Sequence, residues 1–392
     1  MKRPQDRFDF LICRPIIGIP LFFLIMYAVF VISFSGLGAR MTEITETFFF
    51  HLSEQLQTVL FSMGVNEKAV SLLIGIFSDT ASVLSFLPQT AIFFFLLKGL
   101  DECGYMARAV FVTDTLFRKF GLSGNAVIPA VIGCGCSVSA VSAMQNTESH
   151  ERKALLFSIP FLICNARFPV LFFLCDAFFP KYKAFAALGF YSLSFSMFFL
   201  SAFLSSKGKT ASLLIVKLPD YKLPRWAPLF REMKSNCRDY LNRTATIVFL
   251  CAVCFRTAAS LTPWLHFTEK ETESILFLFG KIFSFLFAPL GFGKAPFSAS
   301  LFAGFFAKEN LSFTLEMLSP KELASLLPFP ARVSFTAFSM LYLPCFSMVC
   351  AVGNESGIKK ALHFAVRSLL LAYFVSFILY TLSYVVVAFV KI

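Results

Sequence analysis

Residues 127–173 read VIPAVIGCGCSVSAVSAMQNTESHERKALLFSIPFLICNARFPVLFF. This stretch places cysteines, prolines and an arginine inside segments that are otherwise apolar enough to cross a membrane. Hydrocarbon penalises unsatisfied backbone groups and buried charge, so helix breaks and ionisable side chains at that depth persist mainly where they line a cavity or a pathway. We therefore predict that the functional site lies here.

The composition is that of an integral membrane protein. Of the 392 residues 57% are hydrophobic and only 15% are charged, and 54 are phenylalanine. A soluble chain of this length could not bury so much apolar surface. We predict an all-α fold, a polytopic transmembrane helical bundle of about eight spans with one or two segments re-entrant or broken. Apolar runs near the length of one crossing cover residues 11–34, 81–100, 127–144, 154–179, 185–204, 245–261, 297–315, 333–352 and 365–390.

Charge is distributed unevenly between the loops. Residues 207–243 carry nine Lys or Arg, whereas residues 36–68 carry four glutamates against Arg40 and Lys68. Basic loops stay on the cytoplasmic side, so we expect the first segment inside and the second outside. The net charge of +12 then needs no nucleic-acid partner, because the basic loop faces the lipid bilayer surface. We divide the chain into an N-terminal membrane half (1–206), a basic cytoplasmic loop (207–243) and a C-terminal membrane half (244–392).

Eleven cysteines are an odd number, and most lie within apolar runs, so no disulfide framework is indicated. We interpret Cys13, Cys175, Cys251, Cys254 and Cys350 as small hydrophobic core residues. The C-x-x-C formed by Cys251 and Cys254 has no second ligand pair nearby, as a zinc site would require.

Two segments suggest an internal duplication. PAVIGCG from Pro129 and PLGFGK from Pro289 both place a proline before Gly-x-Gly within a membrane segment. Paired Gly/Pro-interrupted segments in corresponding halves are typical of transporter repeats with a site at the membrane midplane. Membrane helices are also generally rich in Gly and Pro, and these two interpretations stay open at this point.

The first candidate break follows Gly133 and Gly135, which can supply unusual backbone angles or allow close approach. Beyond them a small, polar set falls on roughly one helical face: Cys136, Ser139, Ala143 and Asn146. Such a face either packs helices together or coordinates something that passes.

A second break is predicted near Cys164, because Pro160 and Pro169 flank FLICNARF. The break should free backbone carbonyls beside the thiol, as transient cation ligands. Arg167 cannot readily lose its charge, so it needs an anionic or carbonyl partner within the protein. We expect it to stabilise the break rather than contact substrate.

The C-terminal half carries a similar arrangement. Lys308 and Glu309 interrupt SASLFAGFFAKENLSF, and Glu309 could neutralise a partner elsewhere or bind a cation. Further on, Pro344 directly precedes Cys345, which again places a predicted helix break beside a thiol.

Three predicted breaks thus adjoin Cys136, Cys164 and Cys345. Thiol, amide and carbonyl groups suit borderline first-row metals rather than calcium or magnesium. With four histidines, none near these cysteines, we do not expect a tight resting metal site. A pathway instead needs weak, successive binding.

Several motifs occur in one order that resembles the membrane region of the ferrous iron transport protein B (FeoB) family. They are FLPQTAIFFFLLKGLDECGYMARAVFVTDTLFRKFGLSGNAVIP (86–129), GCGCSVSAV, PFLICNARFPV, FAGFFAKEN, and LYLPC followed by NESG. The resemblance covers nearly the whole chain. It implies two gate-type repeats with broken helices, and Cys136, Cys164 and Cys345 as metal-pathway residues. The supporting gate residues that we select around them are Gly133, Gly135, Ser137, Asn165, Arg167, Pro169, Lys308, Glu309 and Pro344.

The chain departs from the family pattern at two motifs. Members usually read Gly-x-Gly-Cys-Asn-x-Pro-Ala, whereas this chain has Ser137 and Ser139 in place of the asparagine and proline, and Gln145 stands where the family tends to carry arginine. Loss of the proline is expected to remove a helix break, and loss of the amide changes a candidate ligand.

Most family members begin with a GTP-binding domain, but Met1 here lies a few residues before the first apolar run. The only phosphate-loop-like segment, SKGKT, ends in Gly208, Lys209 and Thr210, and Phe203 occupies the required upstream glycine position. We therefore expect no GTP hydrolysis by this chain. A separate GTP-binding subunit docks on it, or it works uncoupled.

The sequence is best explained by a multi-pass permease of the bacterial inner membrane that moves Fe(II), its transported substrate, inward with no bound cofactor. Expected partners are the lipid bilayer, ferrous iron, a separate GTP-binding subunit and a second copy of the chain, with no nucleic acid. Two alternatives stay open, a carrier for another cation or small solute, and a non-transporting membrane subunit that regulates a relative.

Overall fold

The structure is a computed structural model that describes residues 12–206, 219–240, 246–262, 274–306, 308–316, 320–342 and 344–390. Throughout these residues the secondary structure is helical and contains no β-strand, which confirms the all-α prediction. The N-terminal head lies outside the described residues, and so do residues 207–218 and 241–243 of the basic segment that the sequence singled out.

The described chain forms two compact units that exchange segments along the sequence. Unit 1 comprises residues 1–155 and 199–249, and unit 2 comprises residues 156–198 and 250–392. The elements up to the basic segment are α2 (Pro15–Phe30), η1 (Val31–Ser35), α3 (Leu37–Ser62), α4 (Glu67–Ser85), α5 (Leu87–Glu102), α6 (Tyr105–Phe117), η2 (Arg118–Phe120), η3 (Gly124–Ala126), α7 (Val127–Gly135), α8 (Ser137–Ala143), η4 (Met144–Asn146), α9 (Ser149–Ser158), η5 (Ile159–Phe161), α10 (Arg167–Phe178), η6 (Pro180–Tyr182) and α11 (Lys183–Ser206). Those that follow are α12 (Trp226–Tyr240), α13 (Thr246–Ser260), α14 (Ile275–Phe287), η9 (Ala288–Leu290), α15 (Ala295–Phe306), α16 (Glu309–Glu316), α17 (Pro320–Leu326), α18 (Phe329–Leu341), α19 (Phe346–Ser356) and α20 (Ile358–Val390).

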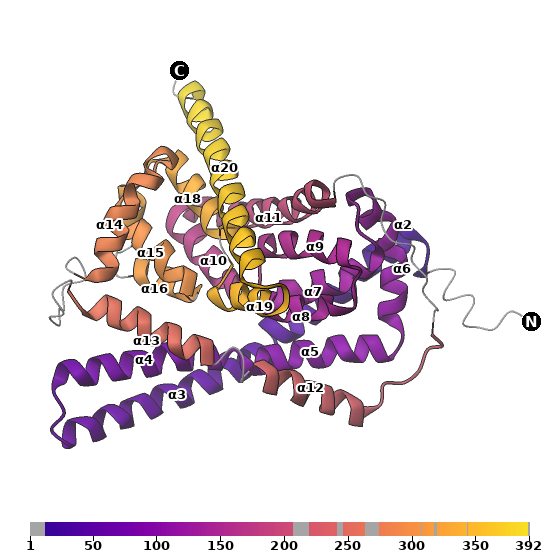
Figure 1. The fold of residues 1–392 in the computed structure, drawn as a ribbon, viewed down its shortest axis with the longest axis horizontal. Helices are drawn as coiled ribbons and strands as arrows, with labels where there is room; N and C mark the ends of the chain where they lie inside the picture. The colour runs from indigo at the N-terminus through magenta and orange to yellow at the C-terminus, as the bar shows by residue number, and fades with distance from the viewer. Residues whose placement is uncertain are drawn as a thin grey trace, which may run out of the picture. The chain divides into compact units, whose positions relative to one another are not determined.

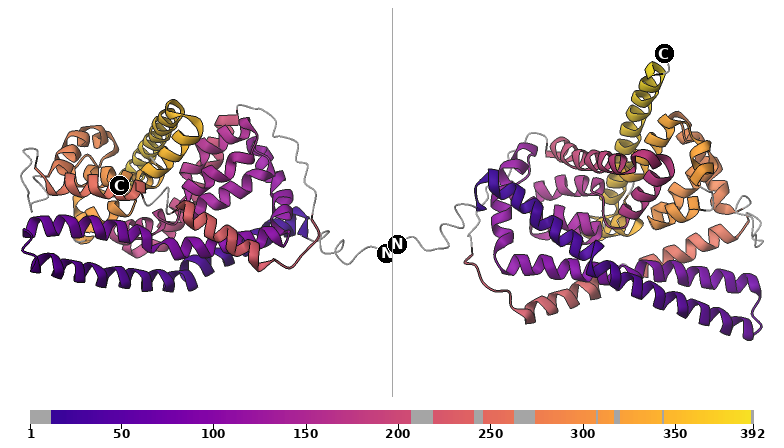
Figure 2. Two further views of the ribbon diagram at one scale, coloured as in Figure 1. Left: turned by 60° about the horizontal axis from the view of Figure 1, so that its bottom comes forward. Right: turned by 180° about the vertical axis from the view of Figure 1, so that it is seen from behind.

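Unit 1 contains a long helical hairpin, α3 and α4, which run side by side in every view (Figure 1 and Figure 2). The turn between them uses Gly64 at φ +74°. The Asn66 side chain then caps α4 by accepting a hydrogen bond from the Lys68 N–H at 3.0 Å. Phe93 of α5 is fully buried, and its ring centroid lies 5.5 Å from that of Phe30 in α2. This ring cluster positions α5 beside α2.

Unit 2 has an aromatic core. The rings of Phe178, Phe297 and Phe292 all pack on Phe335, with centroids 5.1 to 6.1 Å away and near-perpendicular planes. Edge-to-face contacts of this kind stabilise a core beyond its burial of area. They join α10, α15 and α18 into one body, against which α20 packs along α18 (Figure 1).

Five helical segments of the described chain are long and apolar enough to cross a membrane, or six if the pair α14–η9 and α15, bent by 105°, forms one broken span. The chain is therefore a multi-pass helical membrane protein. The predicted count of about eight spans stays a prediction, because α7, α8, α10 and α16 are interrupted helices of 7 to 12 residues, too short to cross alone.

The internal duplication stays a prediction, and the order of the elements suggests a different pairing of its segments from the one that Gly-x-Gly suggested. In the first half η2 ends at Gly121, with φ +76°, before α7 begins. In the second half η9 ends at Gly291, with φ +84°, before α15 begins. By their place in the element order Gly121 and Gly291 are alike, whereas Gly133 lies near the end of α7. A Gly-x-Gly pattern is too common in membrane helices to fix the alignment.

Candidate functional site

The first break in unit 1 lies at Cys136. Its backbone is extended, with φ −144° and ψ 116°, and it separates α7 from α8. The Cys136 N–H donates to the Ile132 carbonyl at 2.7 Å, and its carbonyl accepts from the Ala140 N–H at 3.1 Å. The thiol-bearing residue is half-buried, with buried Gly133 and Ser137 close to it in sequence. The break therefore retains its backbone hydrogen bonds.

The structure corrects two expectations about this segment. The helix is interrupted although Ser139 replaces the family's proline, so loss of that proline has not removed the break. Because Cys136 precedes α8 in extended conformation, it does not share one continuous helical face with Ser139 and Ala143. The side chain of Asn146 lies outside the described residues.

Gly135 accounts for part of this geometry. A β-carbon at Gly135 would overlap the fully buried ring of Phe93. Only glycine lets the end of α7 approach α5 this closely. The close approach is made to a residue far away in the sequence, so it acts independently of the local proline pattern.

The second break lies between η5 and α10, in unit 2. After Phe161 the chain extends through Leu162 and makes a turn in which the Arg167 N–H donates to the Cys164 carbonyl at 3.0 Å. Asn165 is half-buried in this turn. Pro169 is exposed in the first turn of α10, where a helix needs no N–H from it.

Arg167 fastens this break to another. Its guanidinium is 2% exposed, and Nη1 donates to the carbonyls of Pro160 at 2.6 Å and Met340 at 2.8 Å, while Nη2 donates to the carbonyl of Tyr342 at 3.0 Å. These are the carbonyl partners that a buried guanidinium requires. Of the carbonyls near Cys164, that of Pro160 accepts from the Arg167 guanidinium and that of Cys164 accepts from the Arg167 N–H. That freed carbonyls in this break serve as transient cation ligands stays a prediction.

The third break separates α18 from α19. Pro344 is buried, and Cys345 is the extended residue that precedes α19, with φ −57° and ψ 153°. Two residues before Pro344, the Tyr342 side chain is 3% exposed, and its hydroxyl donates to the Leu301 carbonyl at 3.1 Å. Tyr342 therefore links the end of α18 to α15.

Lys308 completes the arrangement in unit 2. It is 3% exposed, at the start of α16, and its ammonium lies 3.6 Å from the centroid of the Tyr342 ring. Such a contact stabilises a desolvated cation. Lys308 is also near enough to Arg167 and to both cysteines to interact with them electrostatically. We call this set the thiol–cation cluster: Cys164, Arg167, Lys308, Tyr342 and Cys345.

Of the predicted pathway residues, unit 2 thus brings Cys164 and Cys345 together with Arg167 and Lys308. Glu309 adjoins the cluster at the first position of α16 and is partly buried. Cys136 belongs to unit 1. Sequence reasoning missed Tyr342, although an aromatic residue two positions before Pro344 was a signal that it could pack against the break.

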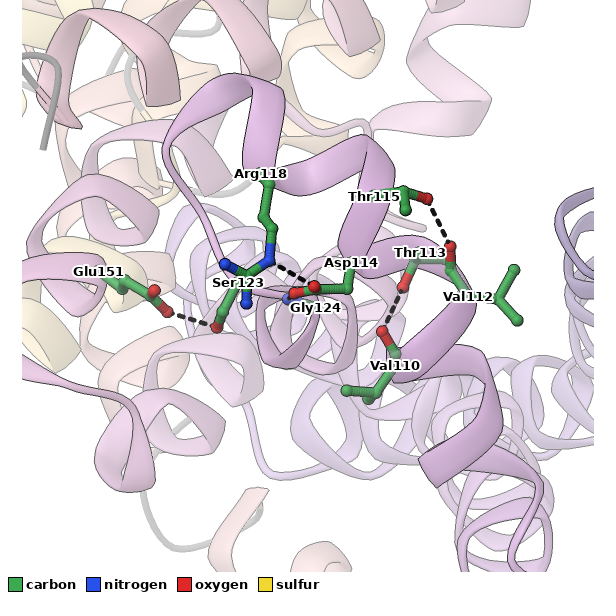
Figure 3. Close-up of polar contacts among 9 residues, drawn as sticks. All are labelled: Val110, Val112, Thr113, Asp114, Thr115, Arg118, Ser123, Gly124 and Glu151. Carbon is green, nitrogen blue, oxygen red and sulfur yellow. Dashed lines mark hydrogen bonds and ion pairs between the residues drawn. The ribbon is translucent and has the colours of Figure 1, made fainter. Parts of the chain in front are cut away.

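A second polar group in unit 1 was also missed, and Figure 3 shows its contacts. Asp114 accepts a hydrogen bond from the Gly124 N–H at 2.8 Å, which closes the turn between α6 and α7. The Ser123 hydroxyl donates to the Glu151 carboxylate at 2.6 Å, and both residues are buried. These contacts tie the α6–α7 turn to α9. The signal was Asp114, the one carboxylate in the sequence of α6.

Within the described residues no group of three or more His, Cys, Asp or Glu side chains is arranged to hold a metal ion. The thiol–cation cluster offers two thiols beside two cations. Two thiols are too few ligands for a closed coordination shell.

The sequence of the chain is similar to those of known membrane proteins. The family described as "Gate: Nucleoside recognition" matches residues 83–178. The chain is 30% identical to an Fe(2+) transporter FeoB of Staphylococcus aureus over 98% of its length, and 32% identical to one of Methanocaldococcus jannaschii over 85%. It is 26% identical, over 98% of its length, to a Porphyromonas gingivalis protein named as a fusion of Fe(2+) transport protein A and FeoB.

The similarity confirms that the chain resembles the membrane region of FeoB transporters. The chain spans 60% of the length of the Staphylococcus aureus relative and 52% of the length of each of the other two. No solved structure matches the chain.

Proposed function

We propose that this protein is a permease for ferrous iron uptake across the bacterial inner membrane. The relatives named as Fe(2+) transporters support the substrate. The observation that carries the proposal is the joining of two broken helices by Arg167, so that Cys164 and Cys345 adjoin one buried centre in unit 2. Helix breaks at membrane depth are tolerated where they serve a site.

The pathway proposal assigns a separate role to each part of the thiol–cation cluster. Cys164 and Cys345 supply soft ligands that suit Fe(II). Arg167 holds the breaks open by hydrogen bonding to their carbonyls, and Lys308 sets the local charge. We assign Cys136, the thiol at the break of unit 1, a role as a soft ligand as well. Fe(II) is the cargo, so binding at each thiol must be weak enough for release.

The experiment is uptake of Fe(II) into proteoliposomes at equal protein content. Cys136→Ala, Cys164→Ala and Cys345→Ala should each reduce uptake at least tenfold, whereas Cys350→Ala and Cys251→Ala should change it less than twofold. Cys350 is the matched control, because it lies in α19 five residues after Cys345 and is also half-buried. Equal uptake by all five variants would remove the thiol pathway.

A second candidate substrate has one observation in its favour. The matching family is described by nucleoside recognition, which suits a small organic solute. Competition distinguishes the two functions. Excess nucleoside should leave Fe(II) uptake unchanged, and uptake of labelled nucleoside into the same proteoliposomes should stay at the level of empty vesicles.

We further propose that nucleotide control reaches this chain from a separate GTP-binding subunit, which docks on cytoplasmic turns such as residues 118–124. The exposed basic side chains of Arg118 and Lys119 would attract an acidic partner face. Co-purification with a GTP-binding protein from the same cells, followed by uptake with and without GTP, tests the coupling. Equal uptake by the chain alone and by the complex with GTP favours an uncoupled permease.

A further inference from the structure

Helix α12 is attached to the last turns of α5 by an apolar stripe. Leu229 is 3% exposed, and the Phe95 ring lies 6.3 Å from the Trp226 ring and 5.5 Å from the Phe230 ring, centroid to centroid. Both helices belong to unit 1, and Figure 1 shows α12 alongside α5. The position of α12 on α5 is thus determined by specific contacts.

The segment before α12 is fixed as well. The Arg225 N–H donates to the Glu102 carboxylate at 3.0 Å. Arg108 donates from Nη1 to the Pro219 carbonyl at 3.0 Å, and its guanidinium carbon lies 3.7 Å from the centroid of the Tyr221 ring. The segment therefore lies against the turn between α5 and α6.

That turn marks the end of a candidate membrane span. Residues Glu67–Glu102 form one of the five helices able to cross the bilayer, and charged Lys98, Asp101 and Glu102 end its apolar sequence. Charged residues at the end of a span lie in the polar interface. Helix α12 starts at this level of the membrane.

Beside its contact with Phe95, α12 carries partly exposed aromatic rings and exposed basic side chains. Trp226 is 68% exposed and Phe230 is 53% exposed, although both are large and apolar. Three basic residues of α12 are also exposed: Arg231, Lys234 and Arg238. Helical periodicity places them on one side of the helix, next to Phe230. Exposed aromatic residues bordering a basic face are typical of helices that lie in the membrane interface.

From these contacts we infer that α12 is an interfacial helix that binds anionic lipid headgroups. Arg231, Lys234 and Arg238 contact the headgroup phosphates, and Trp226 and Phe230 enter the boundary with the acyl chains. Charge complementarity supports this occupant, because residues 207–243 carry nine basic and three acidic residues. The packing of α12 on the α5 span places the helix beside lipid rather than in free cytoplasm.

The test uses the tryptophan of α12 as its own reporter. The chain has two tryptophans, Trp226 and Trp264, so Trp264→Phe leaves a single fluorophore in the full-length protein. This protein is placed in nanodiscs that contain the same mole fraction of brominated phosphatidylglycerol or brominated phosphatidylcholine. Bromine quenches only a tryptophan in contact with that lipid.

We expect quenching of Trp226 by the anionic lipid to exceed that by the zwitterionic lipid at least twofold. Arg231→Gln, Lys234→Gln and Arg238→Gln together should abolish the preference. The matched control is Lys359→Gln with Lys360→Gln, which removes an exposed basic pair from α20 and should leave the preference intact.

Two results would overturn the inference. Equal quenching by both lipids would show that α12 does not select anionic headgroups. Negligible quenching by either lipid, with full quenching by aqueous acrylamide, would show that α12 faces water or a protein partner. Both results come from the Trp264→Phe protein alone, so the test does not depend on the folding of the basic-face variants.

Discussion

Replacing Arg167 tests how much the joined helix breaks depend on one side chain. Arg167→Met removes three buried hydrogen bonds, to the carbonyls of Pro160, Met340 and Tyr342. Bonds from a charged donor contribute about 1.5–3 kcal/mol each, which gives a gross value of about 5–9 kcal/mol. The variant also removes the desolvation cost of a buried charge, so we expect the free energy of unfolding to fall by about 3–5 kcal/mol.

The assay is unfolding of the purified protein in mixed micelles titrated with sodium dodecyl sulfate, followed by fluorescence. Arg332→Met is the matched control, because Arg332 also donates to two carbonyls, those of Ala324 and Leu327, but is only half-buried. We expect its loss to be about 1–2 kcal/mol. Arg167→Lys should lie between the two, since it keeps the charge and loses the planar fork. A loss for Arg167→Met no larger than for Arg332→Met would refute the reasoning.

Three further predictions follow from the fold. Gly135→Ala places a methyl group against the buried ring of Phe93 and should lower the free energy of unfolding by about 1–3 kcal/mol in the same assay. Gly189→Ala is the control, because a methyl group there meets no atom within 4 Å and should not destabilise the protein. A cysteine introduced at Ser53 should be labelled from outside intact cells and one at Ser206 only after permeabilisation, and the opposite pattern would invert the topology. Burial raises the pKa of the Cys237 thiol, so less of this thiol is ionised at neutral pH. Its alkylation, followed by mass spectrometry, should therefore be slower than that of a free cysteine peptide until the pH exceeds the ordinary thiol range.

The sequence predicted the helix breaks where the cause is local. Pro160 and Pro344 remove backbone donors and lie within or directly before the non-helical stretches at Cys164 and Cys345. The all-α class could be predicted from the apolar composition, because segments that span a bilayer must satisfy their backbone hydrogen bonds internally.

What the sequence could not predict depends on contacts between distant residues. The break at Cys136 persists without the family's proline, and the ring of Phe93 that limits the approach of α7 comes from α5. The partners of Arg167 include Met340 and Tyr342, 173 and 175 residues away. A charge pattern indicates that a buried arginine needs carbonyls, but only packing decides which carbonyls lie within reach.

The charges of the thiol–cation cluster bear on how an iron pathway would operate. Among the contacts of Arg167 and Lys308 are carbonyl oxygens and an aromatic ring, groups without net charge. In the proposed pathway the cationic side chains of Arg167 and Lys308 would repel an arriving divalent ion, and a low local dielectric would strengthen that repulsion. Soft sulfur ligands attract the same ion. Opposed in this way, the two effects keep any bound Fe(II) weakly held, and weak binding is what permits an ion to leave toward the next site. Removing the charge, as in Lys308→Met, should then tighten Fe(II) binding while slowing uptake, and binding and uptake that fall together would contradict this account.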